Sequence, residues 1–184
     1  MQSKRFLVAT VLLGFSAAGA VQESPLAPGS GAGATPCGPA VEECLRRVAE
    51  FHGTAGPWAV AGYRMGTRAL RELGLPRHAF SLLVIHRAPA EVQFSCVADG
   101  LQAATGATPG KLNLRVEEVP FTKLSTTVID RKTGRACTFN LRPAFVESIL
   151  NLPHERLEAE GRRVAGLRDD EIFSVTTSTV SGSD

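Results

Sequence analysis

The chain has 184 residues, of which 43% are hydrophobic and 21% are charged, and its formal net charge is +2. This length is typical of one domain with a single sizeable core. The near balance of charges argues against a nucleic-acid-binding protein, because binding to phosphates needs a clustered excess of Lys and Arg.

Residues 1–20 are typical of an export signal. Lys4 and Arg5 precede an apolar run at residues 6–15, and residues 18–20 supply the small side chains of a cleavage site. The run is shorter than the ~20 apolar residues that span a bilayer. We therefore expect an exported, periplasmic or secreted protein with no membrane segment after cleavage; an uncleaved anchor is the alternative.

Residues 21–36 are rich in Pro, Gly, Ala and Ser and are predicted to be a flexible linker. The folded domain is expected to span residues 37–184. Its four cysteines, an even number, would lie in an oxidising compartment, where disulfides form. The best candidate pair is Cys37 and Cys44, and two separate buried thiols are the alternative.

Two helices are predicted at the start of the domain. In residues 39–51, apolar side chains recur every three or four positions with charged residues between them. Residues 57–73 begin at a proline and end before Gly74, which are typical helix boundaries. The second helix has a small-residue face that permits close approach of another backbone, formed by Ala59, Ala61, Gly62, Gly66 and Ala69.

The rest of the chain is predicted to contain strands and a helix in mixed order, then an antiparallel hairpin, then helices. The pattern predicts strands at residues 80–85, 91–96 and 112–119, a helix at 97–105, a hairpin of residues 124–130 and 135–141, and helices after Pro143 and at 157–167. This order favours an α+β fold, with a mixed or antiparallel sheet packed against helices.

Reactive side chains are concentrated in residues 95–114. Cys96 and Asp99 are separated by helical spacing, so they should share one face near the start of the helix predicted at 97–105. A cysteine at a helix N-terminus has a lowered pKa, which suits it to bind a metal or to attack an electrophile. The alternative is an inert buried thiol. Residues 106–111 do not match a Walker phosphate loop, because the spacing and the residue after Lys111 differ.

Two histidines could complete a site with Cys96. His52 lies in a glycine-bounded loop, and His86 ends an apolar strand. Two imidazoles and a thiolate suit zinc or another divalent transition metal. Neither histidine has the spacing of a known metal motif, so each could instead be a hydrogen-bonded structural residue.

Three segments of this chain resemble the FmdE-like family, whose name comes from formylmethanofuran dehydrogenase. They are Phe51-His52-Gly53-Thr54-Ala55-Gly56-Pro57, Gly62-Tyr63-Arg64-Met65-Gly66, and the block from Cys96-Val97-Ala98-Asp99-Gly100-Leu101-Gln102 to Leu114. The similarity covers approximately residues 45–175.

The resemblance implies an α+β domain with a transition-metal site, in which His52 and Cys96 match the family's ligand positions. Thr54 and Gly56 stand where the family pattern has a second histidine and a cysteine, and Ala107 stands where it often has a cysteine. Two ligands are fewer than a zinc site needs, so either His86, or Asp99, completes the set or the metal has been lost.

Three hypotheses follow. The first is a zinc-like site of His52, Cys96 and His86 beside a pocket for a small anionic or cofactor-like ligand. The polar wall of that pocket would consist of Asp99, Gln102, Thr105, Lys111 and Asn113. The second is an accessory subunit of a redox enzyme with a degenerate site, and the third is a metal-independent enzyme with Cys96 as nucleophile and His52 as base. A homodimer through the small-residue face is also open.

Overall fold

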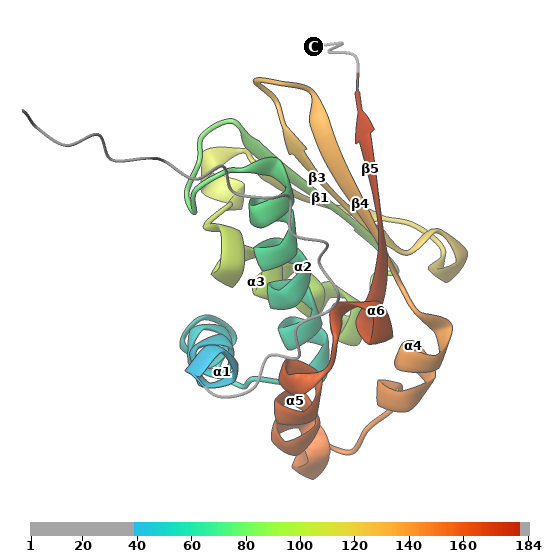
Figure 1. Ribbon diagram of the computed structural model, residues 1–184. Helices are drawn as coiled ribbons and strands as arrows, with labels where there is room; N and C mark the ends of the chain where they lie inside the picture. Colours follow the sequence, from blue (N-terminus) through green and yellow to red (C-terminus); the bar gives the residue numbers. More distant parts are fainter. Residues whose placement is uncertain (1–38, 181–184) are drawn as a thin grey trace, which may run out of the picture. The chain divides into compact units, whose positions relative to one another are not determined.

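The computed structural model describes residues 39–180, which form a sheet with helices packed on it (Figure 1). The helices are α1 (Pro39–His52), α2 (Pro57–Leu73), α3 (Val92–Thr105), α4 (Pro143–Ile149), α5 (Leu157–Gly166) and α6 (Asp169–Ile172). The strands are β1 (Leu82–Ala88), β2 (Leu114–Glu118), β3 (Ser125–Asp130), β4 (Arg135–Leu141) and β5 (Phe173–Thr179). The predicted signal, the predicted linker and Cys37 lie outside the described residues.

The sheet has the strand order β2-β1-β3-β4-β5. Only the β1–β2 pair is parallel, and α3 makes the crossover between these two strands. The other pairs are antiparallel. Alternate residues of β1 are buried, beginning with Leu82 and Val84, so one face of the sheet packs against the helices. The predicted α+β class is therefore confirmed.

The small-residue face of α2 packs closely on α3. A Cβ atom on Gly62 would collide with the carbonyl oxygen of Val97, and one on Gly100 would collide with that of Ala59. The two backbones can approach this closely only because both positions are glycine. The prediction that α2 admits another backbone is confirmed, and the contact fixes α3 relative to the core.

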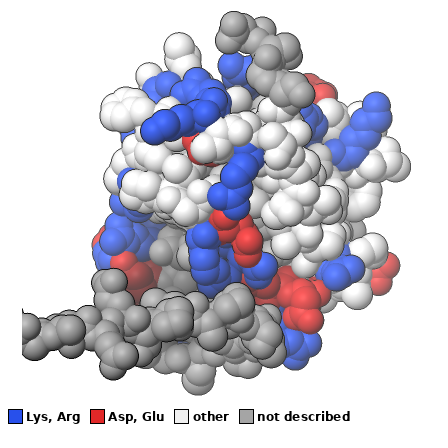
Figure 2. All heavy atoms as spheres, turned by 45° about the horizontal axis from the view of Figure 1, so that its top comes forward, with Lys and Arg blue, Asp and Glu red and all other residues white. Residues whose placement is uncertain are grey.

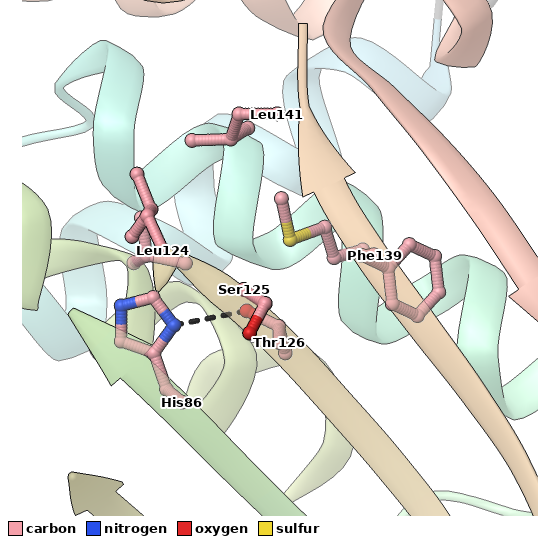
Figure 3. Close-up of a pocket in the computed structure, with 8 residues that line it drawn as sticks. His86, Leu124, Ser125, Thr126, Phe139 and Leu141 are labelled. Atoms are coloured by element: carbon pink, nitrogen blue, oxygen red, sulfur yellow. Dashed lines mark hydrogen bonds between the residues drawn. The ribbon is translucent and has the colours of Figure 1, made fainter. Parts of the chain in front are cut away.

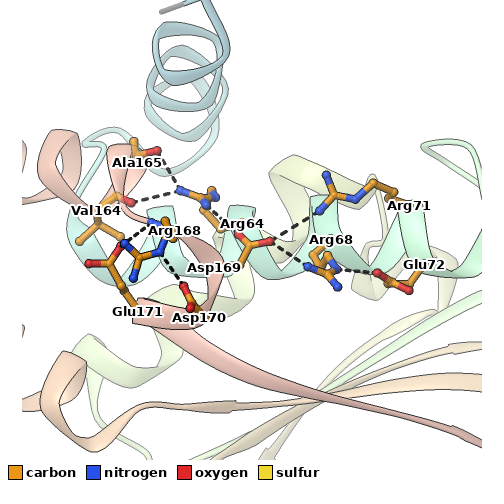
Figure 4. A network of polar contacts seen from close by, with 10 residues as sticks. All are labelled: Arg64, Arg68, Arg71, Glu72, Val164, Ala165, Arg168, Asp169, Asp170 and Glu171. Carbon is orange, nitrogen blue, oxygen red and sulfur yellow. Dashed lines mark hydrogen bonds and ion pairs between the residues drawn. The ribbon is translucent and has the colours of Figure 1, made fainter. Parts of the chain in front are cut away.

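A network of charges joins α2 to the C-terminal helices (Figure 4). The Arg64 guanidinium donates to the carbonyl oxygens of Val164 and Ala165 at the end of α5, and it contacts the Asp169 carboxylate at 2.6 Å. Arg68 and Arg71 approach the same carboxylate. Arg64, part of the second family segment, therefore has a structural role at the C-terminus of α5.

The helices at the start of the domain and the hairpin have the predicted positions, but one prediction is wrong and one strand was missed. Residues 91–96 were expected as a strand, yet Glu91 is the N-cap of α3, which continues without interruption to Thr105. The reason is that Phe94, Val97 and Leu101 form one buried helical face, while the alternation in 91–96 is too short to be decisive. Strand β5 was not predicted at all. No helix among the described residues is long and apolar enough to cross a membrane.

Candidate functional site

The first and third family segments meet through His52 and Asp99. His52 is the last residue of α1, and Asp99 lies in the middle of α3. The distance between His52 Nδ1 and Asp99 Oδ2 is 2.7 Å. The side chains are 24% and 43% exposed, respectively, so the pair reaches the surface. In the neutral tautomer that carries its proton on Nδ1, the ring donates this N–H to the carboxylate, and Nε2 is then free to accept a hydrogen bond or to bind a ligand.

The loop after His52 has a fixed path. Gly53 has a φ of +90°, a left-handed conformation that favours glycine, and it ends α1. Ala55 is buried, and its carbonyl oxygen lies against Gly161 of α5, where a Cβ atom would collide with it. The loop is therefore held between α1, α2 and α5, and it presents His52 to α3.

Cys96 lies on α3 one turn before Asp99 and is half-buried. Burial is the main cause that raises the pKa of its thiol, and the Asp99 carboxylate raises it further. A lowered pKa was expected from a position at the helix N-terminus. This expectation was wrong because α3 begins at Val92, so Cys96 lies in its second turn, beyond the unpaired N–H groups of the first.

His86 does not join the pair. It is 1% exposed in the core, where Nδ1 lies 2.9 Å from Thr126 Oγ1 and Nε2 lies 3.0 Å from the Phe94 carbonyl oxygen. A carbonyl can only accept, so Nε2 carries the proton. Burial lowers the pKa of His86, so the ring is neutral and Nδ1 accepts from the Thr126 hydroxyl. Both nitrogens are occupied within the protein.

The donor set does not fit a metal held by the protein alone. Within residues 39–180, no group of three or more His, Cys, Asp or Glu side chains could hold a metal ion. His52, Cys96 and His86 are thus not brought together as a ligand set. Thr54 and Gly56 supply neither imidazole nor thiolate, and a structural zinc site needs four ligands. The bridge between Cys37 and Cys44 stays a prediction, and burial raises the pKa of Cys44 to about 12.

A narrow depression beside His86 contains about 180 Å³ of empty space, part of it open to solvent (Figure 3). Its lining is mainly apolar and includes Met65, Val97 and Phe139. The His86–Thr126 hydrogen bond crosses its polar side, and no buried side-chain nitrogen or oxygen in the described part of the chain lacks a partner. The buried polar side-chain atoms of the depression therefore all have partners within the protein.

The predicted polar wall has other partners. Thr105 is buried and donates to the Leu101 carbonyl, and the Asn113 side chain accepts from the Thr108 N–H. Lys111 donates to the carbonyl of Gly106 at the C-terminus of α3. These residues brace the turn after α3, while Gln102 is half-buried. Of the five predicted wall residues, Asp99 alone contacts a predicted metal-ligand side chain, and spacing gave no signal for that contact because 47 positions separate the partners.

Comparison with known proteins supports the family resemblance of the three sequence segments. The family model described as "FmdE, Molybdenum formylmethanofuran dehydrogenase operon" matches residues 51–179. The chain belongs to the FmdE family. The crystal structure of a "tungsten formylmethanofuran dehydrogenase subunit e (fmde)-like protein" from Syntrophus aciditrophicus is similar over 77% of this chain and 73% of that chain. The TM-score is 0.54 and the identity 24%, so this FmdE-like protein and our chain share a fold.

A second relative carries a functional description. A "Probable S-adenosyl-L-methionine-binding protein" of Archaeoglobus fulgidus is 29% identical to this FmdE-family chain over 113 residues. The matched segment is 59% of this chain and 30% of that protein. This chain therefore spans less than a third of the length of that relative.

Proposed function

We propose that this chain is a small-molecule-binding domain whose site is centred on the His52–Asp99 pair and needs no resident metal. The observation that carries the proposal is the 2.7 Å contact between the two side chains. It joins the first and third family segments at the protein surface. A carboxylate that holds Nδ1 of a histidine fixes the tautomer and the ring orientation and leaves Nε2 available, as in a ligand-contacting or proton-transferring imidazole.

S-adenosyl-L-methionine is the first candidate ligand. The Archaeoglobus fulgidus relative is described as a probable binder of this molecule. Its sulfonium and ammonium groups are cationic, and the half-exposed Asp99 carboxylate can attract them. The state of Cys96 supports binding over thiol catalysis, because burial and Asp99 raise the pKa of the thiol and keep it protonated.

Isothermal titration calorimetry with S-adenosyl-L-methionine tests the proposal. Wild-type protein should bind, and both His52→Ala and Asp99→Asn should weaken binding by about tenfold or more, as expected for a lost hydrogen bond to a charged group. His154→Ala is the matched control, since His154 is exposed in a turn far along the chain. Equal affinity in wild type, His52→Ala and Asp99→Asn would exclude this pair as the site.

Metal binding is the second candidate function. The hydrogen bond between His52 and Asp99 favours it, because metal-binding histidines commonly donate their other ring N–H to a carboxylate. The decisive comparison uses mass-spectrometric metal analysis of wild type and of Thr54→His/Gly56→Cys, which restores the family residues. Gly56 has a φ of −72° and its Cβ would have no neighbour closer than 4.0 Å, so a cysteine fits. We expect stoichiometric metal in the double variant only; stoichiometric metal in wild type would overturn the metal-free proposal.

A further inference from the structure

One end of the sheet carries a concentration of positive charge, which we call the basic end. Leu82 pairs with Asp130, and Val84 pairs in parallel with Leu114. The segments before β1 and β2 and the β3–β4 turn therefore meet at this end, the upper end in Figure 1. They contribute five exposed cations, Arg77, Lys111, Arg131, Lys132 and Arg135. Blue side chains predominate in the upper half of Figure 2, whereas blue and red lie side by side lower down.

Among residues 39–180, none of these five cations forms an ion pair with Asp or Glu. Of the 18 Lys and Arg residues in the described range 39–180, ten form ion pairs with Asp or Glu, and the basic end provides five of the remaining eight. Several of its guanidinium groups donate to neutral carbonyls instead, as Arg77 does to Ala103 and Arg135 to Glu72. The acid within the turn, Asp130, is 4% exposed and accepts from Lys132 N–H and the Thr133 hydroxyl.

Two large apolar side chains project from the same end. Phe80 is 81% exposed and Leu112 is 76% exposed. Both lie beside cations: Arg131 donates to the Phe80 carbonyl at 2.7 Å, and Leu112 directly follows Lys111 in the chain. Exposed apolar side chains among uncompensated cations match the interface of an anionic bilayer, where apolar groups enter the acyl boundary and cations meet phosphates.

We infer that the basic end binds the surface of membranes that contain anionic lipids. Phe80 and Leu112 enter the interfacial layer, and the five cations contact the headgroups. A bilayer fits better than single-stranded nucleic acid, because stacking on bases uses several large aromatic side chains and the described segments 74–81, 106–113 and 130–135 contain Phe80 but no other Phe, Tyr or Trp. The near-neutral net charge of the whole chain gives no sign of this basic end, because the Asp and Glu side chains that balance the charge form their ion pairs elsewhere.

Sedimentation with lipid vesicles tests the inference on the full chain. The protein should bind vesicles of equimolar phosphatidylcholine and phosphatidylglycerol, and binding should fall as the ionic strength rises, because salt screens surface charges. Vesicles of phosphatidylcholine alone should bind it far more weakly. Equal binding to both vesicles, or no binding to the anionic vesicles at low salt, would overturn the inference.

Substitutions at two exposed positions separate the contribution of charge to vesicle binding from that of apolar burial. Lys132→Gln should lower the partition coefficient about fivefold, the effect expected for one basic residue at an anionic surface. Phe80→Ala should lower it about tenfold through lost apolar burial. The matched controls are Lys123→Gln and Phe51→Ala, which change exposed residues outside the basic end and should bind as wild type does. A loss in the controls equal to that in Lys132→Gln and Phe80→Ala would contradict a localised surface.

A single-stranded oligonucleotide, followed by fluorescence anisotropy at the same ionic strength, is the competing probe. We expect it to bind more weakly than the anionic vesicles, with no dependence on Phe80. If the oligonucleotide binds more tightly than the vesicles and this binding depends on Phe80, the partner of the basic end is a nucleic acid and the membrane inference is wrong. The inference is independent of the proposed ligand site, so His52→Ala should bind vesicles as wild type does.

Discussion

His52 and His86 are both held by α3, yet they do different things. His52 uses Nδ1 on the Asp99 carboxylate, and its side chain is 24% exposed. His86 is buried and uses both nitrogens, on Thr126 and on the Phe94 carbonyl. A histidine with one hydrogen-bonded ring nitrogen can still bind a ligand through the other. A histidine with both ring nitrogens hydrogen-bonded within the protein instead links two structural elements.

The largest effect should come from Gly100→Ala, which disturbs both histidines through α3. The added methyl group would collide with the Ala59 carbonyl, and a backbone atom cannot rotate away. We expect a loss of about 3 kcal/mol or more in the free energy of unfolding, measured by urea denaturation. Gly166→Ala is the control, because its Cβ would meet nothing within 4 Å, and it should be neutral or stabilising.

His86→Ala should follow, with a loss of about 3 kcal/mol. The substitution leaves a cavity and removes the partner of the buried Phe94 carbonyl and Thr126 hydroxyl. His154→Ala, on the surface, should change the free energy of unfolding by less than about 0.5 kcal/mol. If the two variants unfold at the same urea concentration, His86 is not a cross-link.

The pH dependence of stability should reveal His86 as well. Because burial lowers the pKa of His86 in the folded protein, the unfolded chain takes up this proton first as the pH falls below about 6.5. Stability therefore declines with falling pH, by at most about 1.4 kcal/mol per pH unit for one proton. Urea titrations between about pH 7 and 5 should show this decline in wild type and a smaller slope in His86→Leu. A slope that is unchanged in His86→Leu would assign the proton to another group.

Among the substitutions at the two compared histidines, the smaller effect on stability should come from His52→Ala. A half-exposed pair contributes about 0 to 1 kcal/mol, so the variant should unfold within about 1 kcal/mol of wild type while losing the ligand. The same calorimetry and urea series measure both quantities. A loss as large as that of His86→Ala would make His52 a structural residue too.

The local sequence was sufficient for much of the fold but not for its edges. Pro57 and Gly74 mark both ends of α2 because they act within one helical turn. Strand β5 has no such signal: Phe173 is buried, but its last four residues are exposed Ser and Thr, so its pairing with β4 is set by the tertiary structure. The start of α3 was misplaced because a pattern of six residues is too short to distinguish the repeat of a helix from that of a strand.

The site was only partly predictable for the same reason. His52 and Asp99 each stand out by chemistry, but their contact depends on the packing of α1 beside α3. Asn113 and Thr105 also stand out by chemistry, yet they accept and donate within their own turn. Residue type identifies polar groups, and only the partners in space distinguish those that brace the chain from those that remain available.

The contact between Gly161 and the Ala55 carbonyl bears on the order in which the molecule matures. Both family segments that form the His52–Asp99 pair are synthesised well before α5. A nascent chain that ends at β4 contains both side chains, but nothing yet covers the loop that positions His52. We therefore expect the loop to reach its final path only after α5 has packed against it.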